Sequence, residues 1–418
     1  MKKNLSWPII GGHIVECFDN TLYGFFAVML APLFFPSSDP KIQELSSFCA
    51  FAAGYITRPL GAFIFGLVGD RRGRKSPLLY AMMLVGIPTF LMGCVPTYEK
   101  IGLAAPMLLV ILRLIQGVFY GAEFPGVNIY LYETFSKEVL GRYTGILIAS
   151  GVFGAVLASV IGAFVTMEIM PSWAWRIPFF VGGLSAFYIT FLRRNIIETA
   201  SYREAQDEKR VTWHPWLEIF MKYKKNCFVA IVICGFTVVP LYTTTFFGNQ
   251  IFKELGYSTS ESLLLDMIAL IFNGLGILYS GRLADKLGFH RQLLLGCATV
   301  AIVAFPAFWI MSHHLTTWSV FLFIISITVS GTIVNGCAMP YVSNLFPTSC
   351  RYSAVGATWT IGMALIGGMT PVISGALLDK YHSYVMPAYW LMGISTLTFI
   401  LVWLVKDTQS LQEKVKEA

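Results

Sequence analysis

Acidic side chains inside an apolar stretch are the first feature of this sequence that could do chemistry. Residues 16–26, ECFDNTLYGFF, contain Glu16 and Asp19, and the surrounding segment 7–35 is almost entirely apolar. A charged side chain at membrane depth costs about 2.5 to 3.5 kcal/mol or more, so a functional role is the default hypothesis. Spacings of three and four residues place Glu16, Asp19 and Tyr23 on one face of a helix. The stretch therefore predicts a polar helix face that binds a proton or a polar ligand.

A second polar face, which includes a cation, lies further along the chain. Its side chains recur every three or four residues, at Arg113, Gln116, Tyr120 and Glu123. The economical arrangement places the two faces opposite each other across a cavity, with Asp19 near Arg113. Protonation of Asp19 would then release Arg113, which is what proton coupling requires. Glu16 and Glu123 are the other candidates for carrying the proton, and a purely structural bridge between helices is the alternative.

The composition indicates what kind of chain positions these faces. Of 418 residues, 56% are hydrophobic and 13% are charged, which excludes ordinary soluble domains. Apolar stretches of about 20 residues recur throughout, each long enough as a helix to cross a hydrocarbon layer of about 30 Å. The sequence predicts an all-α membrane protein with twelve transmembrane helices, at residues 8–35, 44–69, 77–96, 103–133, 140–167, 174–193, 224–252, 260–283, 292–311, 316–345, 352–379 and 385–405.

Basic residues set the expected orientation of these helices. With both termini in the cytoplasm, the outward connections hold only four basic residues, Lys41, Lys100, Lys253 and Lys380. Lysine and arginine are retained on the cytoplasmic side, so we expect this topology, in a bacterial inner membrane. The formal net charge of +7 is then a topology signal, and no nucleic-acid partner is predicted.

The expected partners are the lipid bilayer, a small-molecule substrate and a proton, with a monomer as the functional unit. The cysteines form no C-x-x-C pair, so the sequence predicts neither a metal site nor a cofactor.

Two loop motifs indicate that the chain is built twice. GLVGDRRGRK at 66–75 and GRLADKLGFHR at 281–291 share the pattern G-x-x-x-D-x-x-G, and Asp70 and Asp285 are 215 residues apart. A second pair, YLYETF and YVSNLF, keeps a similar offset. Two repeats in register predict two pseudo-symmetric six-helix bundles of like orientation around a central cavity. The expected domains are a bundle at 1–193, a cytoplasmic linker at 194–223, a bundle at 224–405 and a short cytoplasmic tail at 406–418.

The residue types of the repeated loop suit a gate. Glycine allows a tight turn and a close helix approach, aspartate can bind the positive end of a neighbouring helix, and arginine can bind carboxylates. Such contacts on one side of the membrane favour a conformation closed to the cytoplasm, although the charges could also serve only as topology markers. The residues expected in this cytoplasmic gate are Asp70, Arg74, Glu133, Arg142, Asp285 and Arg351.

These motifs resemble the major facilitator superfamily over essentially the whole chain, and GDRRGRK is that superfamily's most specific motif. Within it, the chain is similar to the metabolite:proton symporter group, which includes carriers of proline and betaine, 2-oxoglutarate, citrate and shikimate. The stretches that carry the resemblance are ECFDNTLYGFF, TRPLGAFIFG, LRLIQGVFYGAEFPG, WRIPFF and LFPTSCRYSAVG. The resemblance implies bundles that rock around a central site, uptake driven by protons, and an acid in helix one paired with an arginine in helix four. The second repeat departs at Asn344, where Glu133 would be mirrored.

Polar and aromatic residues in several helices extend the expected substrate site. Packing is the alternative for each, because membrane helices use polar side chains to bind one another. The candidates are Tyr23, Gln116, Tyr120, Asn128, Tyr242, Asn249, Asp266, Asn273, Asn335, Tyr341 and Trp359.

Three other polar residues receive structural interpretations. For Arg58 we expect packing or gating before substrate contact, and for Arg176, beside two tryptophans, an anchor at the membrane interface. For His13 a hydrogen bond between helices is expected, with proton relay as the alternative.

The balance of buried charges bears on the substrate class. Deep acids outnumber deep arginines, which favours a zwitterion such as an amino acid or betaine over a carboxylate such as 2-oxoglutarate or citrate. A proton antiporter that exports a drug or siderophore-like compound and a transport-dead nutrient sensor are further alternatives. An enzyme is not expected, because the only nucleophile-like stretch, VSGT at 329–332, has no histidine at matching depth except His13.

Overall fold

The computed structural model describes residues 7–165, 167, 169–208, 214–257 and 259–405. The tail 406–418 and the side chains of Asn249 and Asp266, both expected in the substrate site, lie outside the described residues. All regular structure in the described part is helical. The helices are α1 (Trp7–Phe34), α2 (Pro40–Ile56), α3 (Arg58–Arg72), α4 (Lys75–Cys94), α5 (Tyr98–Ile101), α6 (Ala104–Thr134), α7 (Lys137–Val165), α8 (Arg176–Arg193), α9 (Ala200–Asp207), α10 (Pro215–Lys222), α11 (Lys224–Phe236), α12 (Val239–Glu254), α13 (Thr259–Leu287), α14 (Phe289–His313), α15 (Thr317–Asn344), α16 (Arg351–Gly362), the π-helix η1 (Met363–Gly367), α17 (Thr370–Tyr381) and α18 (Met386–Leu404).

Each predicted span corresponds to one helix or to consecutive helices, and three spans are interrupted. The span 44–69 breaks at Thr57, just before Pro59, and the span 224–252 breaks before Pro240. The span 352–379 passes through η1, where Gly368 N donates to Met363 O at 2.7 Å. Proline lacks the N–H that continues a helix and glycine weakens helix formation, so these residues account for the interruptions.

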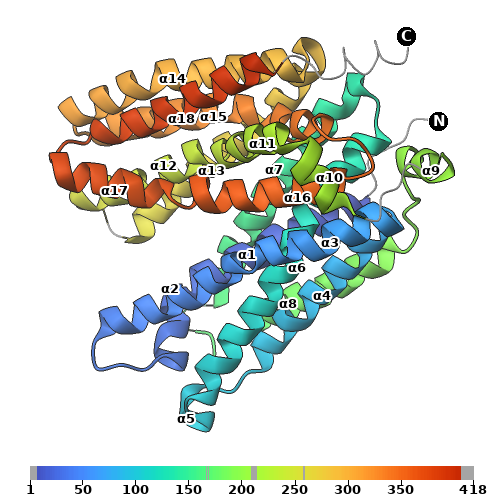
Figure 1. Ribbon diagram of the computed structural model, residues 1–418. Coiled ribbons are helices and arrows are strands. Elements are labelled where there is room, and N and C mark those ends of the chain that lie inside the picture. The colour runs from blue at the N-terminus through green and yellow to red at the C-terminus, as the bar shows by residue number, and fades with distance from the viewer. Residues whose placement is uncertain (1–6, 166, 168, 209–213, 258, 406–418) are drawn as a thin grey trace. The chain divides into compact units, whose positions relative to one another are not determined.

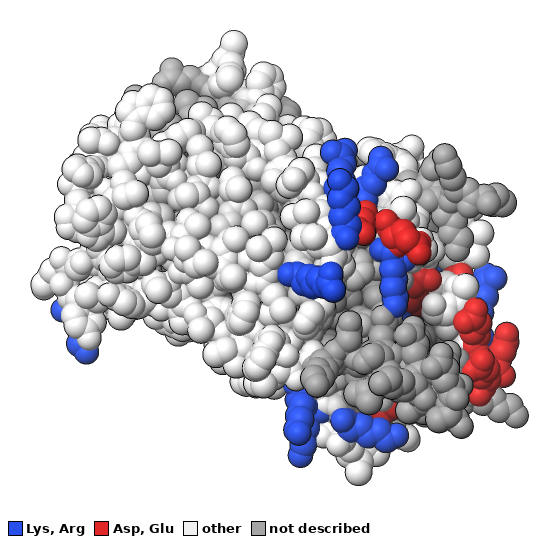
Figure 2. All heavy atoms as spheres, turned by 90° about the horizontal axis from the view of Figure 1, so that it is seen from above, with Lys and Arg blue, Asp and Glu red and all other residues white. Residues whose placement is uncertain are grey.

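Membrane-spanning character is visible in both length and surface. Within the described residues, ten helical stretches are long and apolar enough to cross a membrane. Figure 2 shows a broad surface without acidic or basic side chains, with most charged side chains gathered beyond one end of it.

The chain forms two compact units. The first comprises residues 1–133 and 150–215, and in it α4 packs along α8 while α1 packs against α2 and α8. Its core is rich in aromatic side chains, and the rings of Phe34 and Trp175 meet edge to face with centroids 5.6 Å apart. This packing fixes the polar face of α1.

The second unit comprises residues 134–149 and 216–418. Helix α14 packs against α15 and α18, all three labelled in Figure 1, and α11 packs against α16. The rings of Phe308 and Phe323, 4.6 Å apart, join α14 to α15.

The compact units differ from the predicted repeat boundary in two places. The first part of α7 packs with the second unit, because glycines let it approach α13 closely: a Cβ at Gly281 would lie 2.4 Å from Gly141 O. Most of the predicted linker, up to Pro215, belongs to the first unit. This part of the linker contains α9 and the first residue of α10. Side-chain contacts made by this segment account for its attachment, as described below.

Candidate functional site

Asp19 lies at the centre of a buried polar cluster in the first unit. Its side chain is 2% exposed, and Oδ2 accepts hydrogen bonds from Thr89 Oγ1 at 2.5 Å, Gln116 Nε2 at 2.7 Å and Tyr120 OH at 2.5 Å. These donors come from α4 and α6. Within the described residues, Oδ1 has no hydrogen-bond partner. The carboxylate is therefore held by neutral donors on one oxygen only.

Arg113 lies beside this cluster but does not contact Asp19 directly. Its Nη1 donates to Gln116 Oε1 at 2.5 Å, and its Nη2 donates to Phe51 O at 3.2 Å. The guanidinium also lies 4.4 Å from the centre of the Tyr23 ring. The structure thus brings together the predicted acid, arginine, glutamine and both tyrosines, with the glutamine amide between the two charges. Thr89 was not predicted, because a lone threonine in an apolar helix gives no signal.

A second arginine occupies the neighbouring aromatic face. Arg58 Nη2 donates to Asn20 Oδ1 at 2.8 Å, and its guanidinium lies 3.8 Å from the Tyr55 ring centre and 5.3 Å from that of Tyr120. Among the ion pairs of the described residues, none joins Arg58 or Arg113 to a carboxylate. The site therefore contains two arginines without a direct acidic partner.

Glu123 is paired with Arg193, the last residue of the predicted span 174–193. Arg193 Nη2 and Nη1 donate to the two oxygens of Glu123 at 2.5 and 2.9 Å, and both side chains are 0% exposed. Arg193 also donates to Pro8 O at 3.0 Å. The side chain of Arg193, the last residue of α8, therefore turns inward toward α1 and the buried Glu123.

Glu16 has a different partner again. Its Oε2 lies 3.1 Å from His13 Nδ1, one turn earlier on α1. The His13 ring lies 5.3 Å from the ring of Phe124. The three acids therefore have three kinds of partner: Asp19 has neutral donors, Glu123 a guanidinium and Glu16 an imidazole.

Arg176 contacts the end of a neighbouring helix. Its Nη1 donates to Gly93 O at 2.6 Å and to Val95 O at 2.8 Å, which are carbonyls at the C-terminal end of α4. The guanidinium lies 4.3 Å from the Trp175 ring centre. This residue caps a helix and does not belong to the Asp19 cluster.

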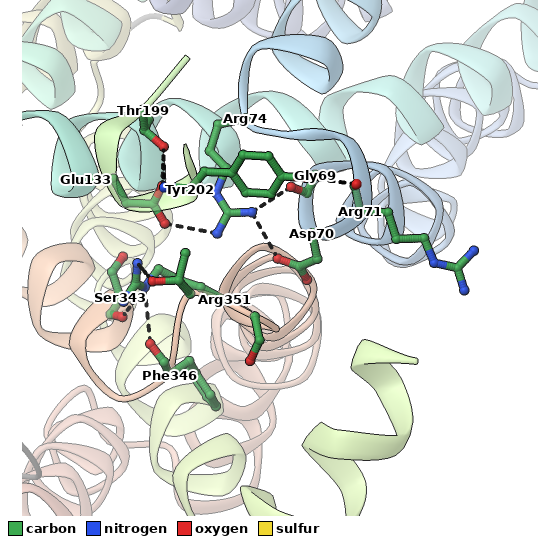
Figure 3. A network of polar contacts seen from close by, with 12 residues as sticks. Gly69, Asp70, Arg71, Arg74, Glu133, Thr199, Tyr202, Ser343, Phe346 and Arg351 are labelled. Atoms are coloured by element: carbon green, nitrogen blue, oxygen red, sulfur yellow. Dashed lines mark hydrogen bonds and ion pairs between the residues drawn. The ribbon is translucent and has the colours of Figure 1, made fainter. Parts of the chain in front are cut away.

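The first loop motif forms a closed charge network (Figure 3). Arg74, 0% exposed, donates through Nε and Nη2 to the two oxygens of Glu133 at 3.0 Å each, and through Nη1 to Gly69 O at 2.6 Å and Asp70 Oδ1 at 3.3 Å. Burial lowers the pKa of Arg74, but the carboxylates of Glu133 and Asp70 outweigh this effect, so its pKa lies above the ordinary value. Arg74 therefore stays charged.

Residues that follow α8 complete this network. Thr199 Oγ1 donates to Glu133 Oε2 at 2.7 Å, and the Glu198 carboxylate accepts from the backbone N–H groups of Arg74 at 2.9 Å and Lys75 at 3.1 Å. Tyr202 OH donates to Arg71 O at 2.8 Å, and burial raises the pKa of this tyrosine. Residues 198–202 were not predicted to take part, because their polar character suggested only a solvated linker.

The second loop motif binds a helix start. Asp285 accepts from the backbone N–H groups of Gly141 at 2.7 Å and Arg142 at 3.0 Å, near the N-terminal end of α7. The motif aspartate thus binds backbone N–H groups in the second turn of a neighbouring helix, α7. The last glycines of the two motifs both have positive φ angles, 96° at Gly73 and 80° at Gly288. Residues other than glycine rarely adopt such angles.

Arg351 caps another helix of the second unit. Its Nε donates to Ser343 O and Phe346 O at 3.1 Å each, around the C-terminal end of α15 (Figure 3).

The remaining substrate candidates vary in burial. Asn128, Asn273 and Tyr341 are buried, and Asn128 Nδ2 donates to Phe124 O at 2.9 Å, while Tyr242, Asn335 and Trp359 are half-buried. The rings of Tyr341 and His290 lie 5.9 Å apart. In the described part of the chain, no group of three or more His, Cys, Asp or Glu residues could hold a metal ion.

Comparisons with known proteins bear on the family and the fold of this chain. A family model described as the Major Facilitator Superfamily matches residues 11–368. The chain is 30% identical to the citrate-proton symporter of Klebsiella pneumoniae, over 92% of this chain and 87% of that protein. It is also 30% identical to the proline/betaine transporter of Escherichia coli strain K12, over 95% and 82% of the two chains. A solved structure of the proton:xylose symporter XylE matches with a TM-score of 0.80 at 15% identity, over 95% of this chain and 94% of that one. The predicted all-helical membrane fold is confirmed.

Proposed function

This chain belongs to the Major Facilitator Superfamily, and on that premise we propose that Asp19 is the proton-coupling residue of a symporter for a small metabolite bearing a carboxylate. Its relatives in sequence are a citrate-proton symporter and proline/betaine transporters. The chain performs proton-coupled symport of a small metabolite, and it belongs to a family of transporters, not enzymes.

The partners of the three acids support Asp19 over Glu16 and Glu123. Protonation of Glu123 would leave the fully buried guanidinium of Arg193 without a counter-charge, and breaking such a pair costs about 3 to 5 kcal/mol. Protonation of Asp19 leaves no directly bonded cation behind, because its donors are two hydroxyls and an amide. Asp19 is thus the acid that can gain and lose a proton at the lowest cost.

The two unpaired arginines support a substrate that carries a carboxylate. The predicted acidic excess disappears once Glu123 is neutralised by Arg193, and Arg58 and Arg113 then have no direct acidic partner among the described residues. Arginine binds carboxylates through paired hydrogen bonds. The rings of Tyr23 and Tyr55 already lie against these guanidinium groups, which leaves them less available to a substrate ammonium. An amino acid, a betaine and citrate all carry the required carboxylate.

The cytoplasmic gate, the single-chain functional unit and the inner-membrane location with cytoplasmic termini belong to the same proposal. In it, Asp285 holds the start of α7 in one conformation, and Arg74 and Glu133 keep the first loop motif rigid. The observations that support this are the Asp285 hydrogen bonds to Gly141 and Arg142 and the burial of Arg74.

Replacement of Asp19 by asparagine tests the proposal. In membrane vesicles offered labelled citrate, proline, glycine betaine or 2-oxoglutarate, Asp19→Asn should strongly reduce uphill uptake. Exchange of labelled for unlabelled substrate should persist, because exchange needs no net proton movement. We expect a loss of accumulation of about tenfold or more, the scale of a typical coupling free energy.

The matched control is Asp207→Asn, at an exposed aspartate at the end of α9. It should accumulate substrate normally. Uphill uptake by the unmodified protein that survives collapse of both the proton gradient and the membrane potential would contradict symport. Normal accumulation by Asp19→Asn would contradict only the residue assignment.

A further inference from the structure

One glutamine is the physical connection between the buried acid and the buried arginine. Gln116 Oε1 accepts from Arg113 Nη1 at 2.5 Å, while Gln116 Nε2 donates to Asp19 Oδ2 at 2.7 Å and to Thr89 Oγ1 at 2.8 Å. Its side chain is 0% exposed. In the described part of the chain, Arg113 has no ion pair with Asp19, so the amide is what joins the two charges.

The bonds of Gln116 leave it little to offer a substrate. Its amide nitrogen donates to Asp19 and Thr89, and its amide oxygen accepts from Arg113. Protein groups therefore engage both the oxygen and the nitrogen of Gln116, which was predicted as a substrate ligand. A different role follows from what lies at its two ends.

The charges at the two ends fix the orientation of the amide. A guanidinium can only donate, so it requires the amide oxygen, and an ionised carboxylate can only accept, so it requires the amide nitrogen. Asp19 Oδ1, which has no partner among the described residues, is the open position for a proton. Protonation there would reduce the Gln116–Asp19 contact from a charge-assisted to a neutral hydrogen bond, which is roughly half as strong.

We propose that Gln116 is a positioning residue that transmits the protonation of Asp19 to Arg113. While Asp19 is ionised, it holds the amide oxygen against Arg113. Once Asp19 is neutral, this hold weakens and Arg113 becomes free to bind the carboxylate of the substrate. This inference rests on the proposed role of Asp19, and it explains how an acid and an arginine that do not touch can act together.

The test separates coupling from binding in Gln116→Met, whose side chain has similar length and no hydrogen-bonding amide. With labelled citrate and labelled proline as probes in vesicles, exchange should stay within about threefold of the unmodified protein, while gradient-driven accumulation should fall about tenfold. The exchange rate should also lose its dependence on pH, because Asp19 no longer influences Arg113.

The double variant Asp19→Asn/Gln116→Met gives the sharpest result. If Gln116 acts only through Asp19, the double variant should accumulate no less than Asp19→Asn alone, because residues that act as one unit are not additive. Additive losses, or a raised KM with normal accumulation at saturation, would overturn the proposal and assign Gln116 to substrate binding.

The control for loss of a buried amide is Gln292→Met. Gln292 is also 0% exposed, and it donates to Ser280 O at 3.0 Å and Ile333 O at 2.9 Å in the second unit. Its ratio of accumulation to exchange should stay normal. If Asp19→Asn uncouples transport and Gln116→Met does not, only the Gln116 proposal fails. If Asp19→Asn remains coupled, the proposed function of Asp19 fails with it.

Discussion

At the scale of single residues, buried charges in the first unit are distinguished by their partners. Asp19 is bound by neutral donors, Glu16 by His13 and Glu123 by Arg193. A buried ion pair adds little net stability, yet removal of one partner is costly because the other charge is stranded. This cost disfavours protonation of Glu123, and it also means that loss of either Glu123 or Arg193 should lower the stability of the protein.

Arg193→Met should destabilise the protein by about 3 to 5 kcal/mol, because Glu123 loses its only guanidinium among the described residues. Adding Glu123→Leu should recover most of that loss, since the pair is then replaced by apolar side chains. Thermal unfolding in detergent, followed by circular dichroism, measures both.

Arg194→Met, at the exposed neighbouring arginine, is the control and should unfold at nearly the normal temperature. Equal stability of Arg193→Met and the double variant would show that the two charges do not depend on each other.

At the scale of elements, the connection after α8 is a structural part of the first unit. The Glu198 carboxylate accepts hydrogen bonds from the backbone N–H groups of Arg74 and Lys75 at the start of α4. The first N–H groups of a helix have no acceptor within the helix, so this carboxylate supplies one. Thr199 donates to Glu133, which is paired with Arg74. Gly73 is required here twice over: its φ is 96°, and a Cβ would lie 2.1 Å from Glu198 Oε2. The glycine of the motif therefore makes room for the cap.

Glu198→Ala should destabilise the protein by about 1 to 2 kcal/mol, the value of a helix N-terminal cap. The measurement is the same thermal unfolding, with Glu204→Ala as the control because Glu204 lies on the exposed face of α9. If both alanine variants unfold alike, the Glu198 hydrogen bonds do not stabilise α4.

At the scale of the whole molecule, the two copies of the loop motif form similar turns, and the distribution of basic residues predicts the orientation in the membrane. The two motif turns share their backbone conformation at Gly73 and Gly288, although their side chains have different partners. The sequence repeat thus preserves the turn, while each copy supplies its own contacts.

Reporter fusions test the predicted orientation. Alkaline phosphatase is active only outside the cytoplasm, so a fusion after Lys100, between α4 and α6, should be active, whereas a fusion after Asp207, in α9, should be inactive. The reason is the retention of lysine and arginine on the cytoplasmic side. A green fluorescent protein fusion should give the opposite pattern at both positions, and the reverse result would invert the topology.

Sequence patterns were enough to predict the helical membrane fold. The main correction is that proline-containing segments interrupt some of the predicted spans. Hydrophobic length, charge placement and the twin glycine turns are local properties, so they can be read along the chain. Helical spacing also placed Asp19 and Glu16 on one face, and Arg113, Gln116, Tyr120 and Glu123 on another.

Which of these groups contact one another depends on the packing of the helices and could not be predicted from the sequence. Thr89 lies 70 positions from Asp19, and Arg193 lies 70 positions from Glu123. Neither partner is signalled by periodicity, because it is the packing of α4, α6 and α8 around α1 that brings them within hydrogen-bond distance. A sequence shows where a charge must be satisfied, but the choice of partner depends on how the helices pack.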